Sequence, residues 1–156
     1  MPNANVYISS TYSDLVSYRK EVMNSLLALR VFHVLGMEYY VAESKEPLAA
    51  CLEDVANCNI YILIIANRYG YVNAGQTPGL EYSITHQEYL KAKELGKQIL
   101  VFKVADGDTR FPIDSDDPEQ PSSAIKQAKL QEFIKEVRGK YLMHPNGFTS
   151  EYQLAL

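Results

Sequence analysis

The sequence lacks the features that mark a secreted, membrane-bound or disulfide-bonded protein. It has no tryptophan, two cysteines and three histidines in 156 residues. Its longest apolar run, Ile60–Ala66, is far shorter than the roughly 20 residues of a membrane-spanning helix, and MPNANVYIS has no basic, apolar signal-peptide pattern. Cys51 and Cys58 lie about 10 Å apart on an expected helix, too far to pair. We therefore expect a cytoplasmic protein with free thiols and no membrane partner.

Basic residues are too few and too dispersed for a nucleic-acid surface. Fifteen Lys and Arg stand against nineteen Asp and Glu, a formal net charge of −4. A phosphate backbone is bound by clustered Lys and Arg, whereas the dense charge cluster here, Asp114–Glu119, is acidic. The sequence predicts no nucleic-acid partner.

Several motifs of nucleotide and catalytic chemistry are missing. The segment Ser9–Asp14 contains no glycine, which excludes a Rossmann fingerprint and a P-loop. Ala66 and Asn67 stand where a phospho-acceptor receiver domain has its aspartate. No G-x-S-x-G elbow is present, and the histidines show no metal-ligand spacing: His33, His86 and His144. We expect no bound metal and no resident cofactor.

The chain alternates between strand and helix patterns. Strands are expected over Asn5–Ser9, Val31–Leu35, Ile60–Ala66, Gln98–Val104 and, as a short fifth one, Tyr141–Met143; helices are expected over Asp14–Leu29, from Pro47, over Ser83–Leu95 and over Ser123–Arg138. The continuous apolar run at residues 60–66 is typical of a central strand of a parallel sheet. Short connections of this kind place helices on both faces. We predict a flavodoxin-like, three-layer α/β fold with a mainly parallel sheet in the order 2-1-3-4-5.

We expect one α/β domain over residues 1–144. Residues 145–156 resemble the start of another helix or a linker, which indicates a domain taken from a longer protein. The acidic loop Asp106–Ser122, with three prolines, is predicted to be mobile or to contact a partner.

The first loop carries three hydroxyls at the carboxyl end of a strand. In such sheets ligands bind there, beside the switch point between strands 1 and 3. The backbone amides of Ser9, Ser10 and Thr11 also precede a helix N-terminus, which favours anions and sugar oxygens. Alternatively, Thr11 or Ser13 caps the helix and Asp14 complements its dipole. Both interpretations can hold, because one hydroxyl can cap while its neighbours bind.

Glu88 is an acidic residue within an apolar helical stripe. At about 100° per residue it falls among Ile84, Leu95 and Ala92. A carboxylate directed toward a core is costly unless it is paired or hydrogen-bonded. One explanation is a capping box, Thr85-x-x-Glu88. The other is a carboxylate that points into the crevice, where partial burial sets its pKa and orientation.

Further candidates follow the second and third strands. Arg68 can clamp a phosphate and Tyr69 can stack on a base, or Arg68 can simply be a surface residue before a turn. Glu38 stands where ribose-binding acids lie in dinucleotide folds. His86 is expected to face solvent, and His33 to be structural.

Several of these stretches together resemble a known family. They are VYISSTYSDL (6–15), GMEYY (36–40), RYG (68–70), SITHQEY (83–89) and Gly96-Lys97. Over residues 5–104 the chain resembles a TIR-like family labelled as a domain of unknown function, which opens with F-I-S-S-T-Y-x-D-L and stands N-terminal to STAND- or NACHT-type signalling NTPases or repeat arrays. That family is related to TIR domains and to nucleoside deoxyribosyltransferases.

The resemblance implies a catalytic site. In those relatives a glutamate on the helix after the third strand acts at the ribosyl centre of an N-glycoside, and by position this role falls on Glu88. Ser83 would then lie at the mouth of the site, and Ser9–Thr11 would face it. The chain departs from the family at three positions, none of them the glutamate: Asn59, His86 and Gln98.

Three functions remain open. The first is an effector that hydrolyses or transfers the N-glycosyl group of NAD or a related nucleotide; a single carboxylate can suffice because the leaving pyridinium is already cationic. The second is a non-catalytic module that self-associates within a larger receptor, using residues 106–121 and surface tyrosines. The third is a nucleotide-binding sensor.

Overall fold

The fold is built on a parallel β-sheet. The computed structural model describes residues 3–36, 47–143 and 146–154. Within them the sheet has four strands, namely β1 (Ala4–Ser9), β2 (Phe32–Leu35), β3 (Ile60–Ile65) and β4 (Gln98–Lys103). Their order is β2-β1-β3-β4, and each pairing is parallel. The predicted α/β class and parallel sheet are confirmed.

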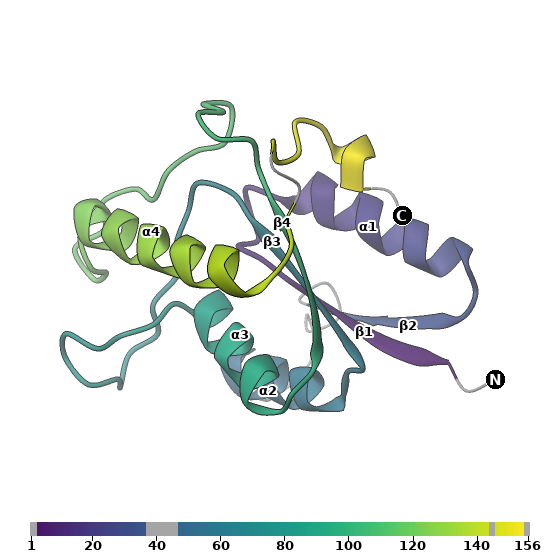
Figure 1. Ribbon diagram of the computed structural model, residues 1–156. Coiled ribbons are helices and arrows are strands. Elements are labelled where there is room, and N and C mark those ends of the chain that lie inside the picture. Colours follow the sequence, from purple (N-terminus) through teal and green to yellow (C-terminus); the bar gives the residue numbers. More distant parts are fainter. Residues whose placement is uncertain (1–2, 37–46, 144–145, 155–156) are drawn as a thin grey trace.

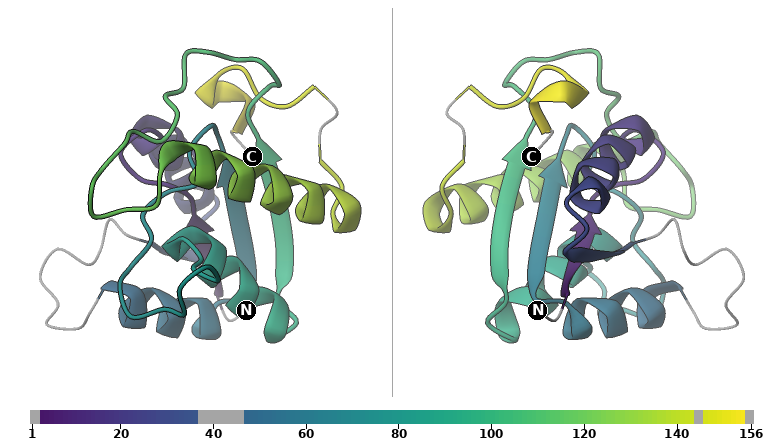
Figure 2. Two further views of the ribbon diagram at one scale, coloured as in Figure 1. Left: turned by 90° about the vertical axis from the view of Figure 1, so that its left-hand side faces the viewer. Right: turned by 90° about the vertical axis from the view of Figure 1, so that its right-hand side faces the viewer.

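Helices cover both faces of the sheet (Figures 1 and 2). They are α1 (Val16–Ala28), α2 (Pro47–Asn57), α3 (Ile84–Glu94), α4 (Ser123–Lys140) and the 3-10 helix η2 (Glu151–Leu154). One buried cluster joins the sheet to α2, α3 and α4, and a second joins it to α1 and η2. The three predicted layers are therefore present.

The position of β3 in the sheet explains why its sequence is continuously apolar. Tyr61 and Leu63 face the α2–α4 layer, while Ile62 and Ile64 face α1. Since both faces are buried, no polar alternation is needed. The carboxyl ends of β1 and β3 are adjacent at the switch point of the sheet.

The prediction of a fifth strand at Tyr141–Met143 is wrong: the structure describes these residues, and they form no strand. α4 continues to Lys140 rather than ending at Arg138, so this segment leaves the helix end as coil, with Leu142 fully exposed. The edge beside β4 is instead contacted by Phe148, whose N–H donates to Lys103 O at 2.9 Å and whose carbonyl accepts from the Ala105 N–H at 2.9 Å.

The acidic loop is anchored to the domain. Phe111 is buried against the rings of Tyr18 and Phe148, and the Asp114 carboxylate is buried as well. The loop is thus attached to the domain at Phe111 and at Asp114.

Cys51 and Cys58 are buried and form no disulfide, as predicted. Burial raises the pKa of the Cys51 thiol to about 12, which leaves it unreactive at neutral pH. Among the residues that are described, no helix has both the length and the apolar character needed to cross a bilayer.

Candidate functional site

A pocket of about 220 Å³ opens at the carboxyl ends of β1 and β3. One wall is the β1–α1 loop, Ser10–Ser13. Another comes from the segment after β3, with Arg68, Gly70 and Tyr71, and the first turns of α3 complete it. The crevice therefore lies where the fold predicts a ligand site.

Glu88 lines this pocket from α3 although it is only 3% exposed. Its Oε2 accepts a hydrogen bond from the Tyr7 hydroxyl, and its Oε1 accepts one from Ser9 Oγ at 3.0 Å. Both donors belong to β1. The carboxylate is thus oriented by the central sheet and not by its own helix.

The capping-box explanation of Glu88 is wrong. The N-cap of α3 is Ser83, whose Oγ accepts the His86 N–H at 3.2 Å. Thr85 instead lines the pocket. Because Ser83 is the N-cap residue, the Glu88 carboxylate is not needed to cap α3 and can turn toward β1.

Burial raises the pKa of Glu88 to about 7, although the hydrogen bonds from Tyr7 and Ser9 and the positive charge of Arg19 act in the opposite direction. Near neutral pH both protonation states of the Glu88 carboxyl group are therefore populated. A group with this behaviour beside a cavity is suited to acid–base or electrostatic chemistry.

Arg19 of α1 is completely buried beneath the first loop. Its Nη1 donates to Ser10 Oγ at 3.0 Å and its Nη2 to the Ile8 carbonyl at 3.1 Å. The guanidinium carbon lies 5.6 Å from the ring centroid of Tyr12. Arg19 therefore holds the loop on the pocket side and supplies positive charge behind it.

The first loop does not cap α1 as expected. Leu15 is the N-cap residue and makes no side-chain capping bond. Thr11 Oγ1 donates to Asp14 Oδ2 at 2.9 Å, and Ser13 Oγ accepts from Arg68 Nη1 at 2.8 Å. The Thr11 hydroxyl thus stabilises the loop itself, while Arg68 joins Ser13 and Asp14 to the segment after β3.

Asp114 fixes that segment from the acidic loop. Its carboxylate accepts from the main-chain N–H groups of Tyr69 and Gly70 at 2.7 and 3.0 Å. Arg68 Nε lies 4.0 Å from the same carboxylate. The Arg68–Tyr71 wall of the pocket is therefore held from behind by a carboxylate that is distant in the sequence.

The structure brings together some of the predicted ligand-binding residues and separates others. Ser10, Thr11 and Arg68 line the pocket, and Ser9 is buried behind Glu88. Ser83 is fully buried at the start of α3. Glu38 lies outside the described residues.

Tyr69 points away from the cavity, into the core. Its hydroxyl is hydrogen-bonded to His86 Nδ1 at 2.8 Å. The expectation that His86 faces solvent is wrong, because its ring stacks on Phe133 with centroids 4.1 Å apart. Burial lowers the pKa of His86 to about 4, so it is neutral at physiological pH. The exposed rings at the cavity are those of Tyr12 and Tyr71.

Three residues important for this site were not identified from the sequence: Tyr7, Arg19 and Asp114. Arg19 carried a signal, since Leu15, Arg19, Val22 and Leu26 follow helical spacing. Tyr7 and Asp114 carried none, because their roles depend on partners that are far away in the chain.

Gly70 provides a test of how closely the two loops approach. Its φ is +102°, and a Cβ there would lie 2.9 Å from Thr11 Cγ2. We expect Gly70→Ala to destabilise the domain by about 1–3 kcal/mol in urea unfolding, because backbone strain and a clash coincide. Gly75 is the matched control: its φ is +90° but nothing lies within 4 Å of the added Cβ. Equal losses for the two variants would show that the Thr11 contact has no effect.

A family model described as "Domain of unknown function (DUF4062)" matches residues 5–156. "Telomerase protein component 1" from Mus musculus is 30% identical over 83 residues, which is 45% of this chain. The chain spans 3% of the length of that relative.

Proposed function

The chain belongs to the DUF4062 family of domains of unknown function, and we propose that it cleaves the N-glycosidic bond of NAD or a related nucleotide, with Glu88 as the catalytic residue. One observation carries the proposal: the Glu88 carboxylate is oriented by two hydrogen bonds, has a pKa near neutrality and borders a cavity rimmed by hydroxyls and aromatic rings.

The pocket offers groups that could bind the base, the ribose and a phosphate of the proposed substrate. Its volume of about 220 Å³ admits one base and ribose, and the exposed rings of Tyr12 and Tyr71 offer surfaces for stacking. The hydroxyl oxygens of Ser10 and Thr11 lie beside the cavity and can accept hydrogen bonds from sugar hydroxyls, because their own hydrogens are donated to Thr11 O and Asp14 Oδ2. The N-terminal end of α3 contributes partial positive charge for a phosphate.

The proposed reaction needs one carboxylate. The bond between C1′ and the pyridinium nitrogen breaks, and its electron pair goes to the nitrogen, which becomes neutral as nicotinamide leaves. The ionised Glu88 stabilises the positive charge that develops at C1′. Water then bonds to C1′ and gives its proton to Glu88, which returns it to solvent.

The rate of nicotinamide release should depend on pH through this carboxyl group. Because only the ionised form stabilises a cation, kcat/KM should fall about tenfold per pH unit below pH 7 and level off above it. We would measure nicotinamide released by the purified chain from pH 5 to 9. A rate that stays flat down to pH 5 would contradict a role for the Glu88 carboxylate.

A non-catalytic interaction module is the second candidate. Tyr71, Leu80 and Tyr82 lie exposed on the segment between β3 and α3, and exposed tyrosines are common in protein interfaces. In this alternative the domain self-associates within a longer signalling protein. Concentration-dependent light scattering without turnover of NAD, even at high protein concentration, would favour it. Calorimetric binding of NAD without turnover would favour a sensor.

A further inference from the structure

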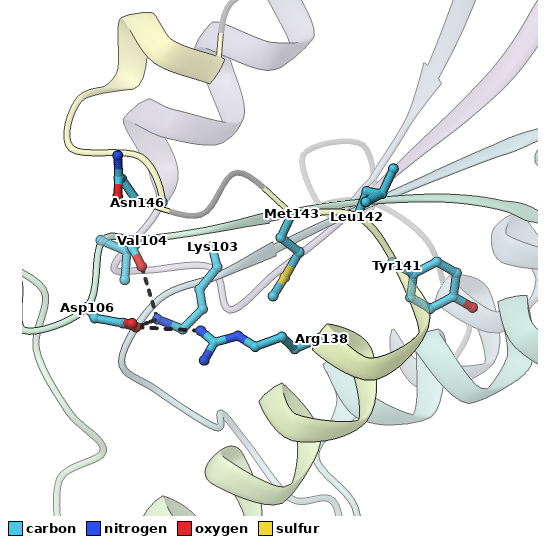
Figure 3. A pocket seen from close by; sticks show the side chains of 9 residues that line it. Lys103, Val104, Asp106, Arg138, Tyr141, Leu142, Met143 and Asn146 are labelled. Atoms are coloured by element: carbon cyan, nitrogen blue, oxygen red, sulfur yellow. Dashed lines mark hydrogen bonds and ion pairs between the residues drawn. The ribbon is translucent and has the colours of Figure 1, made fainter.

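A second cavity, of about 400 Å³, lies between the end of β4 and the end of α4 (Figure 3). Lys103 and Arg138 point toward Asp106 there, and Tyr141 and Met143 belong to the same cavity lining. Another hollow, of about 230 Å³, is also lined by Lys103, Asp106 and Arg138. These three residues, here called the Lys103 triad, thus stand between two cavities.

Lys103 breaks the pattern of its strand. Ile99 and Val101 precede it at spacings of two and face the buried α2–α4 layer, so Lys103 occupies the next position on a core-facing row. Its side chain is only 11% exposed. Burying an ammonium group opposes folding unless the group has partners, and departures from a local rule of this kind concentrate at functional sites.

The internal partner of the two cations is a carboxylate that is itself exposed to solvent. Lys103 Nζ donates to the Val104 carbonyl at 3.0 Å and to Asp106 Oδ1 at 2.7 Å. Arg138 Nη2 lies 3.7 Å from the same oxygen, too far for a hydrogen bond. The Asp106 side chain is 74% exposed on a loop, whereas both cations stand on regular elements.

We propose that the Lys103 triad binds a small phosphomonoester with an apolar or aromatic body, and that Asp106 occupies the place of its phosphate when no ligand is bound. The triad carries a surplus of one positive charge, and a phosphate offers enough oxygens for Lys103 and Arg138 at once. The apolar body would lie against Met143, which stands between the triad and Tyr141 in Figure 3. This site is separate from the Glu88 pocket and does not depend on the function proposed for it.

Phenyl phosphate and inorganic phosphate are suitable probes. We expect calorimetric titration of the intact chain with phenyl phosphate to saturate at one site, at least threefold more tightly than with inorganic phosphate because the ring adds apolar contact. Glu88→Gln should bind equally well. Absence of saturable binding by either probe would overturn the proposal.

Variants of the triad should then move the affinity in opposite directions. Lys103→Met, which continues the apolar row, and Arg138→Gln should each weaken binding at least tenfold. Asp106→Asn should strengthen it severalfold, because it removes the competing charge. Asp108→Asn is the matched control, since Asp108 lies on the same loop but pairs with Arg110. Equal effects of Asp106→Asn and Asp108→Asn, or unchanged binding by the Lys103 and Arg138 variants, would show general charge attraction and reject the site.

Discussion

Replacing Glu88 by Gln is expected to reduce kcat for nicotinamide release by about 10²–10³-fold, the range seen when one preorganised electrostatic contact is removed. Gln has nearly the same shape, and its carbonyl can still accept from Tyr7 or Ser9. What it lacks is the negative charge at the floor of the pocket. The measurement is steady-state release of nicotinamide at pH 8, where Glu88 is mostly ionised.

The same variant should not lose stability. The pKa of Glu88 is raised on folding from 4.5 to about 7. The free energy of unfolding therefore falls as the pH rises from about 4.5 to 7, because the folded state binds the proton more tightly. Gln avoids this loss, which amounts to about 3 kcal/mol at most. We therefore expect the urea midpoint of Glu88→Gln at pH 8 to be at least as high as that of the parent chain. The difference between the two midpoints should vanish near pH 4. A large loss at pH 8 would mean that the carboxylate is structural.

Arg19→Met should be the most destabilising single change near the pocket, by about 3–5 kcal/mol at pH 8, in the range for removing one partner of a buried charged network. Met fills much of the same space but donates no hydrogen bond to Ser10 or to the Ile8 carbonyl. The positive charge that opposes the rise in the Glu88 pKa is lost as well. Urea unfolding at pH 8 and pH 5 measures the effect.

The pH dependence separates the electrostatic part from the packing part. At pH 5 Glu88 is mostly protonated, so Arg19→Met should cost less there than at pH 8. In the Glu88→Gln background the cost should become nearly independent of pH. If the cost of Arg19→Met is the same at both pH values, the charge of Arg19 does not act on Glu88.

The layers of the fold could be predicted because they follow from local patterns. The apolar run of β3 and the helical spacing around it depend on residues close in the chain. The prediction of a fifth strand was wrong because three residues, Tyr141–Met143, do not indicate where α4 ends. The strand-like contact instead falls on Phe148, whose partner is set by tertiary packing.

The site could be predicted in part for a related reason. Glu88 stood out because one charge interrupted an apolar stripe, and its burial confirms that part of the inference. Arg19 interrupts α1 in the same way, but Tyr18 beside it also fits the helical spacing, so the sequence alone does not single out Arg19. His86 was misplaced because a polar residue in the first turn of a helix usually faces water, whereas here Phe133 of α4 covers it.

The bond between Asp114 and the main chain at Tyr69 and Gly70 spans more than forty positions of the sequence. The acidic loop contributes nothing to the lining of the Glu88 pocket, yet it supplies the acceptor on which the shape of one wall rests. Homologous chains with identical lining residues but a shortened or rewritten acidic loop would therefore have a differently shaped cavity. If the proposed activity holds, substrate preference would then diverge through a segment that does not line the pocket.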